Sequence, residues 1–405
     1  MNVVFVAPYA METTLRFARR AAELPGIRLG MISQEPGEAL VRELGGKLAA
    51  FERVENALDP DQVQRATRAI ASHLGGKVDR LLGVLEQLQE PLALVRERLQ
   101  IRGMDLAEAR NFRDKARMKD ALRAAGLPCA RHALARTADE ARAFAKQVLP
   151  LVVKPPDGAG ARNTQRIDSL EQLESWMGSF PPTKENPLLL EEFILGKEHS
   201  FDTVMVHGKL LWSSISEYTP GPLEVMENPW IQWCVVLPRS VEGDSYDPIR
   251  REGERALKTL GMFTGLSHME WFRRADGSIA ISEVGARPPG AQFTTLLSFA
   301  HDRDFYRSWA ELMVHETFTP PARNWSVGAV YLRGQGGSRV NRVHGVEALQ
   351  KELGELIMQA RIPRAGQPKS ETYEGEGYVI VRHQETETVK RALNRVLELI
   401  QVEMA

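Results

Sequence analysis

The sequence predicts a multidomain chain that joins an open α/β lobe to mixed α/β and α+β parts, and three observations indicate this fold class. Its 405 residues exceed the size of one ordinary hydrophobic core, which favours several lobes. A strand–helix–strand pattern near the N-terminus is typical of a parallel sheet with a right-handed crossover. Beyond residue 111, short apolar strands alternate with amphipathic helices and loops rich in Gly and Pro.

The N-terminal lobe is expected over residues 1–110. No glycine fingerprint for dinucleotide binding follows its first predicted strand, so a plain Rossmann dehydrogenase is a poor interpretation. The expected elements are strands at 3–6, 27–33 and 79–84 and helices at 13–24 and 91–99.

A second part is expected over 111–320, divided at 190/191, and a C-terminal α+β part over 321–405. A helix at 113–125 ends at a Gly-Leu-Pro stop signal, and 137–140 resembles a capping box that opens another helix. The remaining expected elements are strands at 149–154, 188–192, 200–206, 326–332 and 377–381 and helices at 346–353 and 387–403.

The composition limits the partners and the compartment. The net charge of -1 gives no reason to expect nucleic acid or a membrane surface as a partner. Cys129 and Cys234 lie far apart without metal-ligand spacing, which favours a reducing compartment. The N-terminal apolar run is too short for a signal peptide, and no run approaches a membrane span. We expect a cytoplasmic protein.

Two glutamates flank a predicted hairpin. Asp-Gly at 276–277 is a strong signal for a two-residue turn, and that register places Glu270 opposite Glu283 with Cβ atoms about 5 Å apart. Opposed like charges destabilise a sheet, whereas a divalent cation between them reverses the effect, so the pair suggests a magnesium site. A solvated strand face and a general acid/base pair are the alternatives. A turn longer by one residue would break the opposition.

Other candidate residues surround a glycine-rich loop. Lys154 ends a predicted strand and precedes the loop 155–164, whose small residues let backbone amides approach a polyanion. The lysine precedes the glycines, so this is not a Walker A motif, and an ordinary loop fits equally well. Lys115 alone is compatible with a solvated helix lysine. The connector 188–202 is suited to presenting backbone groups to a purine and a carboxylate to ribose, or is an ordinary strand–turn–strand.

Taken in order, these motifs resemble the ATP-grasp superfamily, above all its carboxylate-amine ligases and biotin carboxylase-like members. The resemblance covers about residues 111–300. It implies an ATP-grasp fold between an N-terminal open α/β lobe and a C-terminal α+β lobe, with ATP and Mg²⁺, or Mn²⁺, as cofactors. The motifs that carry it are Lys115, Lys154 with its glycine loop, the connector from Glu191 to Ile194, Glu198, Glu270, and the run from Glu283 to Arg287.

The resemblance also implies roles for the nucleotide-binding positions. Lys115 and Lys154 would bind the ATP phosphates, and the loop that contains Gly158 and Gly160 would close over them. The implied adenosine contacts are the backbones of Glu192 and Ile194 for adenine and the carboxylate of Glu191 or Glu198 for ribose.

At the reacting centre the resemblance implies that Glu270 and Glu283 hold magnesium and that Arg287 faces the transferred phosphoryl group, where a planar guanidinium matches anionic oxygens. Many family members have Asn two residues after the second metal-binding Glu. Gly285 occupies that position here, which removes one expected metal ligand. His268 shares the strand face of Glu270 and is a candidate substrate or phosphate contact, or simply a packed neighbour.

Substrate contacts are harder to assign. Trp230 and Trp233, in a long loop, either line an apolar pocket or pack the loop down. Arg333 is a candidate anchor for a substrate carboxylate, and a surface arginine beside a turn is the plainer interpretation.

The implied reaction activates a carboxylate as an acyl-phosphate and condenses it with an amine, as in amino-acid or dipeptide ligases. The expected partners are small-molecule acids and amines, in a homodimer by resemblance. Alternatives are a biotin carboxylase-like or formyl-phosphate-forming enzyme, and a non-catalytic nucleotide-binding regulatory protein. The presence of Lys154, Glu270, Glu283 and Arg287 weighs against the regulatory alternative.

Overall fold

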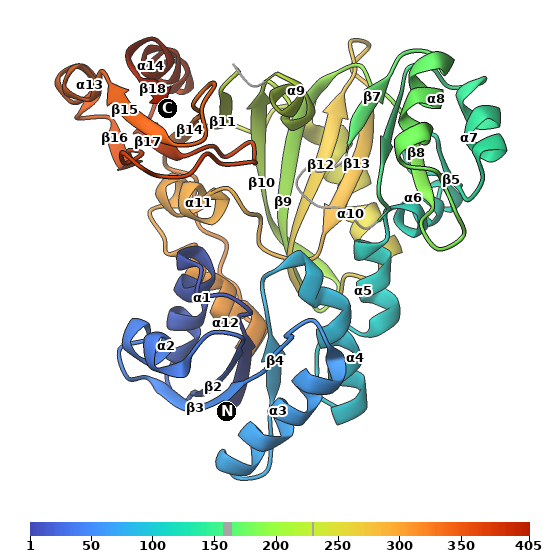
Figure 1. Cartoon of the computed structure of the whole chain (residues 1–405). Coiled ribbons are helices and arrows are strands. Elements are labelled where there is room, and N and C mark those ends of the chain that lie inside the picture. Colours follow the sequence, from blue (N-terminus) through green and yellow to red (C-terminus); the bar gives the residue numbers. More distant parts are fainter. Residues whose placement is uncertain (157–163, 229–230) are drawn as a thin grey trace.

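The computed structural model describes residues 1–156, 164–228 and 231–405 (Figure 1). Its N-terminal lobe is built on a parallel sheet in the order β3-β2-β1-β4, as the strand–helix–strand spacing predicts. Helices cover this sheet and bury its apolar strands. The elements are β1 (Asn2–Val6), α1 (Glu12–Ala22), β2 (Arg28–Ser33), α2 (Gly37–Glu43), β3 (Leu48–Arg53), α3 (Pro60–His73), β4 (Arg80–Leu82), η1 (Glu86–Leu88) and α4 (Gln89–Leu99).

A second, antiparallel sheet has the order β5-β8-β6-β7. Helices α7 and α8 pack on it around a separate apolar cluster. The predicted capping box is present, because the side chains of Thr137 and Glu140 cap each other's backbone. The elements of this part are α5 (Leu106–Arg113), α6 (Lys115–Ala124), β5 (His132–Ala135), α7 (Ala138–Ala145), β6 (Leu151–Lys154), β7 (Gln165–Ile167), α8 (Leu170–Ser179) and β8 (Leu188–Glu192).

The largest sheet is antiparallel in the order β13-β12-β9-β10-β11-β14-β17-β16 and faces the second sheet (Figure 1). It continues across residue 320, where the sequence predicts a domain boundary; the boundaries themselves stay predictions. Its strands are β9 (Lys197–Val206), β10 (Lys209–Thr219), β11 (Trp233–Leu237), β12 (Gly265–Arg273), β13 (Ile279–Gly285), β14 (Ser326–Leu332), β16 (Ile357–Arg361) and β17 (Gly377–His383).

Helices and a small ribbon complete the fold. α14 packs on β11, β14 and β17, while α11 packs on β14. The predicted helix at 387–403 is too long, because its last residues form β18 and pair with β15. The remaining elements are α9 (Pro222–Glu227), η2 (Asp244–Tyr246), α10 (Asp247–Leu260), α11 (Phe293–His301), α12 (Phe305–His315), β15 (Val340–His344), α13 (Val346–Leu353), α14 (Thr386–Leu399) and β18 (Gln401–Met404).

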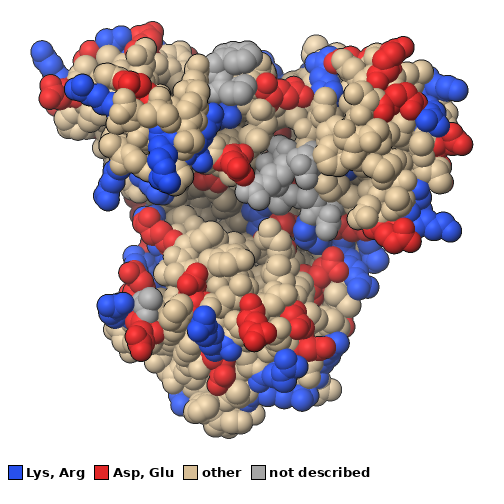
Figure 2. Space-filling view, in the orientation of Figure 1, with Lys and Arg blue, Asp and Glu red and all other residues tan. Residues whose placement is uncertain are grey.

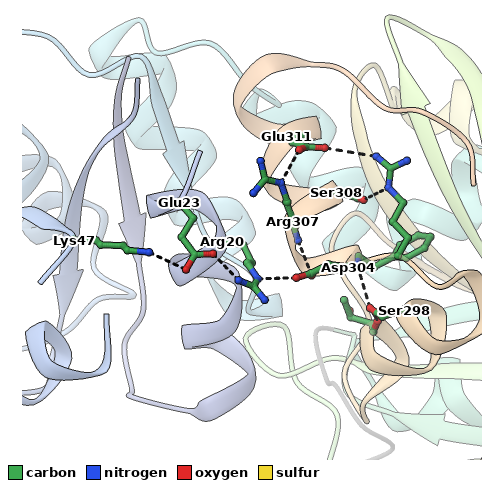
Figure 3. A network of polar contacts seen from close by, with 11 residues as sticks. Arg20, Glu23, Lys47, Ser298, Asp304, Arg307, Ser308 and Glu311 are labelled. Carbon is green, nitrogen blue, oxygen red and sulfur yellow. Dashed lines mark hydrogen bonds and ion pairs between the residues drawn. The ribbon is translucent and has the colours of Figure 1, made fainter. Parts of the chain in front are cut away.

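The N-terminal lobe is joined to the rest of the chain through α1 and α12. The ring of Phe17 contacts Trp309 edge-on at 5.0 Å between centroids. Beside it, Arg20 Nε lies 2.7 Å from Asp304 Oδ2 and extends a charged chain from Glu23 and Lys47 (Figure 3). An apolar core and a polar rim therefore hold this contact together.

Surface properties agree with the composition. Basic and acidic side chains are interspersed on the face seen in Figure 2. Within the described ranges, no helix combines the length and apolar character that crossing a bilayer requires. Cys129 and Cys234 are both free thiols.

Candidate active site

A cavity of about 1370 Å³ opens between the second sheet and the large sheet. It gathers most of the candidate residues that lie far apart in the sequence. Those that line it are Lys115, Lys154, Glu191, Glu192, Ile194, Glu198, Trp233, His268, Glu270, Glu283 and Arg287. Gly158, Gly160 and Trp230 lie outside the described residues.

The predicted opposition of Glu270 and Glu283 is present in the β12–β13 hairpin. The turn is one residue longer than predicted, because Arg274 N–H donates to Ser278 O and Gly277 takes a positive φ of 83°. A bulge between Glu270 and Trp271 restores the register further along the hairpin. Two departures from the simple hairpin therefore cancel, and both carboxylates line the cavity.

Lys115 and Lys154 bring positive charge to this carboxylate pair. Lys115 begins α6, where Asp114 caps the helix, and its Nζ lies 2.8 Å from Glu283 Oε1. Burial alone would raise the pKa of Glu283, but Lys115 and Lys154 overcome that effect and lower it to about 2. Glu283 is therefore ionised and able to accept a cation.

Glu191 is bound by two lysines. Its carboxylate lies 2.9 Å from Lys154 Nζ and 3.3 Å from Nζ of Lys119, a fully buried residue that the sequence analysis missed. Lys119 also donates to Ser282 O at 2.7 Å, at the bulge of β13. Lys119 thus ties together α6, the second sheet and the strand that carries Glu283. A lysine one helical turn after Lys115 was the only sequence signal for it.

The connector after β8 supplies the remaining nucleotide candidates. Glu192 N–H donates to Arg131 O at 2.8 Å, and Ile194 is buried against Ala130 and Ala280. Glu198 faces the cavity, and burial together with repulsion from Glu270 raises its pKa well above the usual range. The two ribose candidates therefore differ in their surroundings: two lysines bind Glu191, whereas the charge of Glu270 repels the charged form of Glu198.

His268 is oriented by a buried carboxylate. Its Nδ1 lies 2.6 Å from Oδ1 of Asp202, which is fully buried, and its Nε2 lies 3.8 Å from Glu270 Oε1. Burial alone would lower the pKa of His268, but Asp202 overcomes this and raises it to about 9. His268 is therefore a fixed cation beside Glu270.

Arg287 receives a partner from the N-terminal lobe. Its Nε donates to Glu86 Oε2 at 2.5 Å, and Nη1 donates to Pro288 O at 3.0 Å. A Cβ on Gly285 would meet Glu86 Oε2 at 3.6 Å, an ordinary contact, so sterics do not explain the glycine at this position. Glu86, distant in sequence, is the second residue that the sequence analysis missed.

Besides His268, the two other substrate candidates among the described residues differ. Trp233 lines the cavity, stacked on Tyr331 at 4.8 Å between ring centroids, and its buried Nε1 has no hydrogen-bond partner among the described residues. Arg333 is absent from the described cavity lining. Its Nη1 donates to the carbonyl oxygens of Val225 and Ile231, which fixes the segment around α9. In the structure, Arg333 therefore binds backbone carbonyls of the segment around α9.

The donor set fits a hard divalent cation. Two opposed carboxylates, one of them held ionised, supply the oxygen ligands that magnesium prefers, and it commonly completes its shell with water and substrate phosphates. Three or more metal-ligating side chains do not converge anywhere in the described parts of the chain.

The sheets, their order and this cavity define the ATP-grasp fold, and the comparisons confirm it. An L-amino acid ligase from Bacillus licheniformis superposes with a TM-score of 0.78 at 17% identity, covering 100% of this chain and 98% of that one. The biotin carboxylase domain of a 2-oxoglutarate carboxylase from Hydrogenobacter thermophilus, in complex with MgADP and bicarbonate, superposes with a TM-score of 0.65 at 16% identity, covering 99% and 90%.

The chain is also similar in sequence to an amino-acid ligase, the type of enzyme that the resemblance implied. The chain is 27% identical over 246 residues to an L-arginine-specific L-amino acid ligase of Bacillus subtilis. That match covers 59% of this chain and 59% of the relative, so the chain spans little more than half of its length. No protein-family model matches the chain.

Proposed function

We propose that this protein is an ATP-dependent carboxylate-amine ligase that uses amino acids as substrates. The observation that carries the proposal is the convergence of two opposed carboxylates, two lysines and an arginine in one cavity. Similarity to an L-amino acid ligase supports the amino-acid substrates.

Each group has a task in this reaction. Lys115 and Lys154 would neutralise charge on the ATP phosphates. Glu270 and Glu283 would hold a magnesium ion, which would supply further positive charge for those phosphates. A substrate carboxylate oxygen attacks the γ-phosphorus, ADP leaves, and Arg287 stabilises the charge on the transferred phosphoryl group. The amine of the second substrate then attacks the acyl carbon, phosphate leaves, and the amine loses a proton.

The metal, the compartment and the assembly state of the protein are part of the same proposal. Mn²⁺ is expected to replace Mg²⁺, because both are hard cations that prefer oxygen ligands. A cytoplasmic location agrees with the two free thiols. A homodimer is proposed by analogy with similar ligases, and sedimentation would test it.

The test measures phosphate release from ATP and Mg²⁺ against single amino acids and pairs of amino acids, with product masses recorded. We expect release that requires a particular pair and a product mass equal to the pair less one water. A bicarbonate arm tests the biotin carboxylase-like alternative. ATP binding without release under any pair would contradict the proposal.

A matched variant tests the metal pair. Glu283→Gln keeps the shape of the side chain and removes its charge, so we expect turnover to fall by about a hundredfold or more while the fold is retained. Glu254→Gln, on α10 and partly exposed with an ion pair to Lys258, is the control. Unchanged turnover in Glu283→Gln would remove the magnesium role from this residue.

A further inference from the structure

A second cavity of about 260 Å³ lies between the N-terminal lobe and the start of β12. Its walls come from β4, α4, the loop 102–105, residues 262–266 and α12. Arg287 lines both this cavity and the larger one. The second cavity is therefore a distinct space behind the wall of the candidate active site.

A buried arginine faces this cavity. Arg96, on α4, is only 7% exposed. Its Nη1 makes one long hydrogen bond of 3.5 Å to Leu81 O, and its buried Nε has no partner among the described residues. Burial lowers the pKa of Arg96 to about 10, so the guanidinium stays charged at neutral pH. A buried guanidinium without an ion-pair partner or a full set of hydrogen bonds is costly, so the unsatisfied Nε of Arg96 is unusual.

The other arginines of the N-terminal lobe that line the cavity have ion-pair partners, whereas the carboxylates of Asp105 and Glu108 bind backbone N–H groups. Arg80 and Arg102 both pair with Glu316, at 3.3 Å and 2.5 Å. Glu108 and Asp105 cap each other's backbone at the start of α5. In the ranges the structure describes, no carboxylate oxygen lies within ion-pair distance of Arg96, and Glu108 attracts it only from further away.

We propose that this cavity binds a small oxyanion, a carboxylate or inorganic phosphate, through Arg96. The space exceeds that of one such ion and leaves room for bridging waters, since each water takes about 30 Å³. A planar guanidinium binds the two oxygens of such a group in parallel. The bound anion contacts both the N-terminal lobe and the wall that carries Arg287, so it stabilises their packing. This proposal does not rest on the proposed ligase activity.

The test is calorimetric titration of the full chain, without nucleotide, with sodium phosphate and separately with sodium acetate. The active-site lysines also attract phosphate, so the titrations are repeated in Lys154→Met, where we expect an anion-binding event to persist. Arg96→Met should weaken that event about tenfold or more, because it removes charge-assisted hydrogen bonds. Arg98→Met, on the exposed face of the same helix, is the matched control and should bind as the wild type does.

The two anions identify the source of the oxyanion. Arg96-dependent binding of acetate alone indicates a carboxylate ligand, and binding of phosphate alone indicates free phosphate. Arg96→Met is expected to fold, because removal of an unpaired buried charge does not destabilise the protein. Arg96→Lys keeps the positive charge but lacks the planar guanidinium. Its anion affinity should lie between those of the wild type and Arg96→Met. Equal anion affinity in Arg96→Met and the wild type would overturn the proposal. So would the loss of all anion binding in Lys154→Met.

Discussion

At the scale of single residues, the buried Lys119 shows how the side of the cavity that carries Lys154 and Glu191 is stabilised. We predict that Lys119→Met lowers the free energy of unfolding by about 1–3 kcal/mol, because Ser282 O loses its donor and Glu191 loses one of its two lysines. Glu191 then binds Lys154 alone, so the KM for ATP should rise. Urea unfolding and ATP kinetics measure both effects, with Arg123→Met on the exposed side of α6 as control. An unchanged KM would show that Lys119 acts on stability alone.

His301 gives a pH-dependent prediction. Burial, with help from Arg323, lowers its pKa to about 4, whereas an unfolded histidine titrates near about 6.5. Between these values the unfolded chain binds more protons, so stability falls as pH falls. We expect a loss of about 2 kcal/mol from this group between about pH 7 and about pH 5. Urea unfolding of His301→Gln should lack this component, whereas the exposed His73→Gln should keep it.

At the scale of elements, the β12–β13 hairpin shows what the sequence could and could not predict. The opposed carboxylates are present as predicted, but the two-residue Asp-Gly turn used to derive them was wrong. The longer turn and the compensating bulge were not predictable, because a bulge has no local sequence signature strong enough to fix its position. β18 was missed for a related reason: its partner β15 is remote in sequence, and tertiary pairing overrode the helical periodicity at 387–403.

The turn of this hairpin can be tested directly. Gly277 has a φ of 83°, and a Cβ placed there meets no atom within 4 Å, so only backbone strain opposes a side chain. We predict that Gly277→Ala destabilises the protein by about 1 kcal/mol. Gly178→Ala, in α8 and equally free of contacts, should instead be neutral or stabilising by up to about 1 kcal/mol. Thermal unfolding of both variants compares them; equal effects would contradict the turn conformation.

At the scale of the whole molecule, the site depends on contacts that no local pattern reveals. Lys154, Glu270 and Glu283 were recognisable because each lies at a strand with a motif around it. Glu86 was not, because its link to Arg287 exists only once the N-terminal lobe docks on the large sheet. The same docking forms the second cavity around Arg96. The geometry of Arg287 is therefore a property of the assembled lobes.

This docking should depend on its apolar core more than on its charged rim. Trp309 is 3% exposed and packs against Phe5 and Phe17, whereas the Arg20–Asp304 pair is partly exposed. We predict that Trp309→Ala costs about 3–5 kcal/mol in urea unfolding and that Arg20→Ala costs about 1 kcal/mol or less. Trp309→Phe, which keeps an aromatic ring, should recover part of the loss. A larger effect for Arg20→Ala than for Trp309→Ala would place the stability of the lobe contact in the charged network of Figure 3.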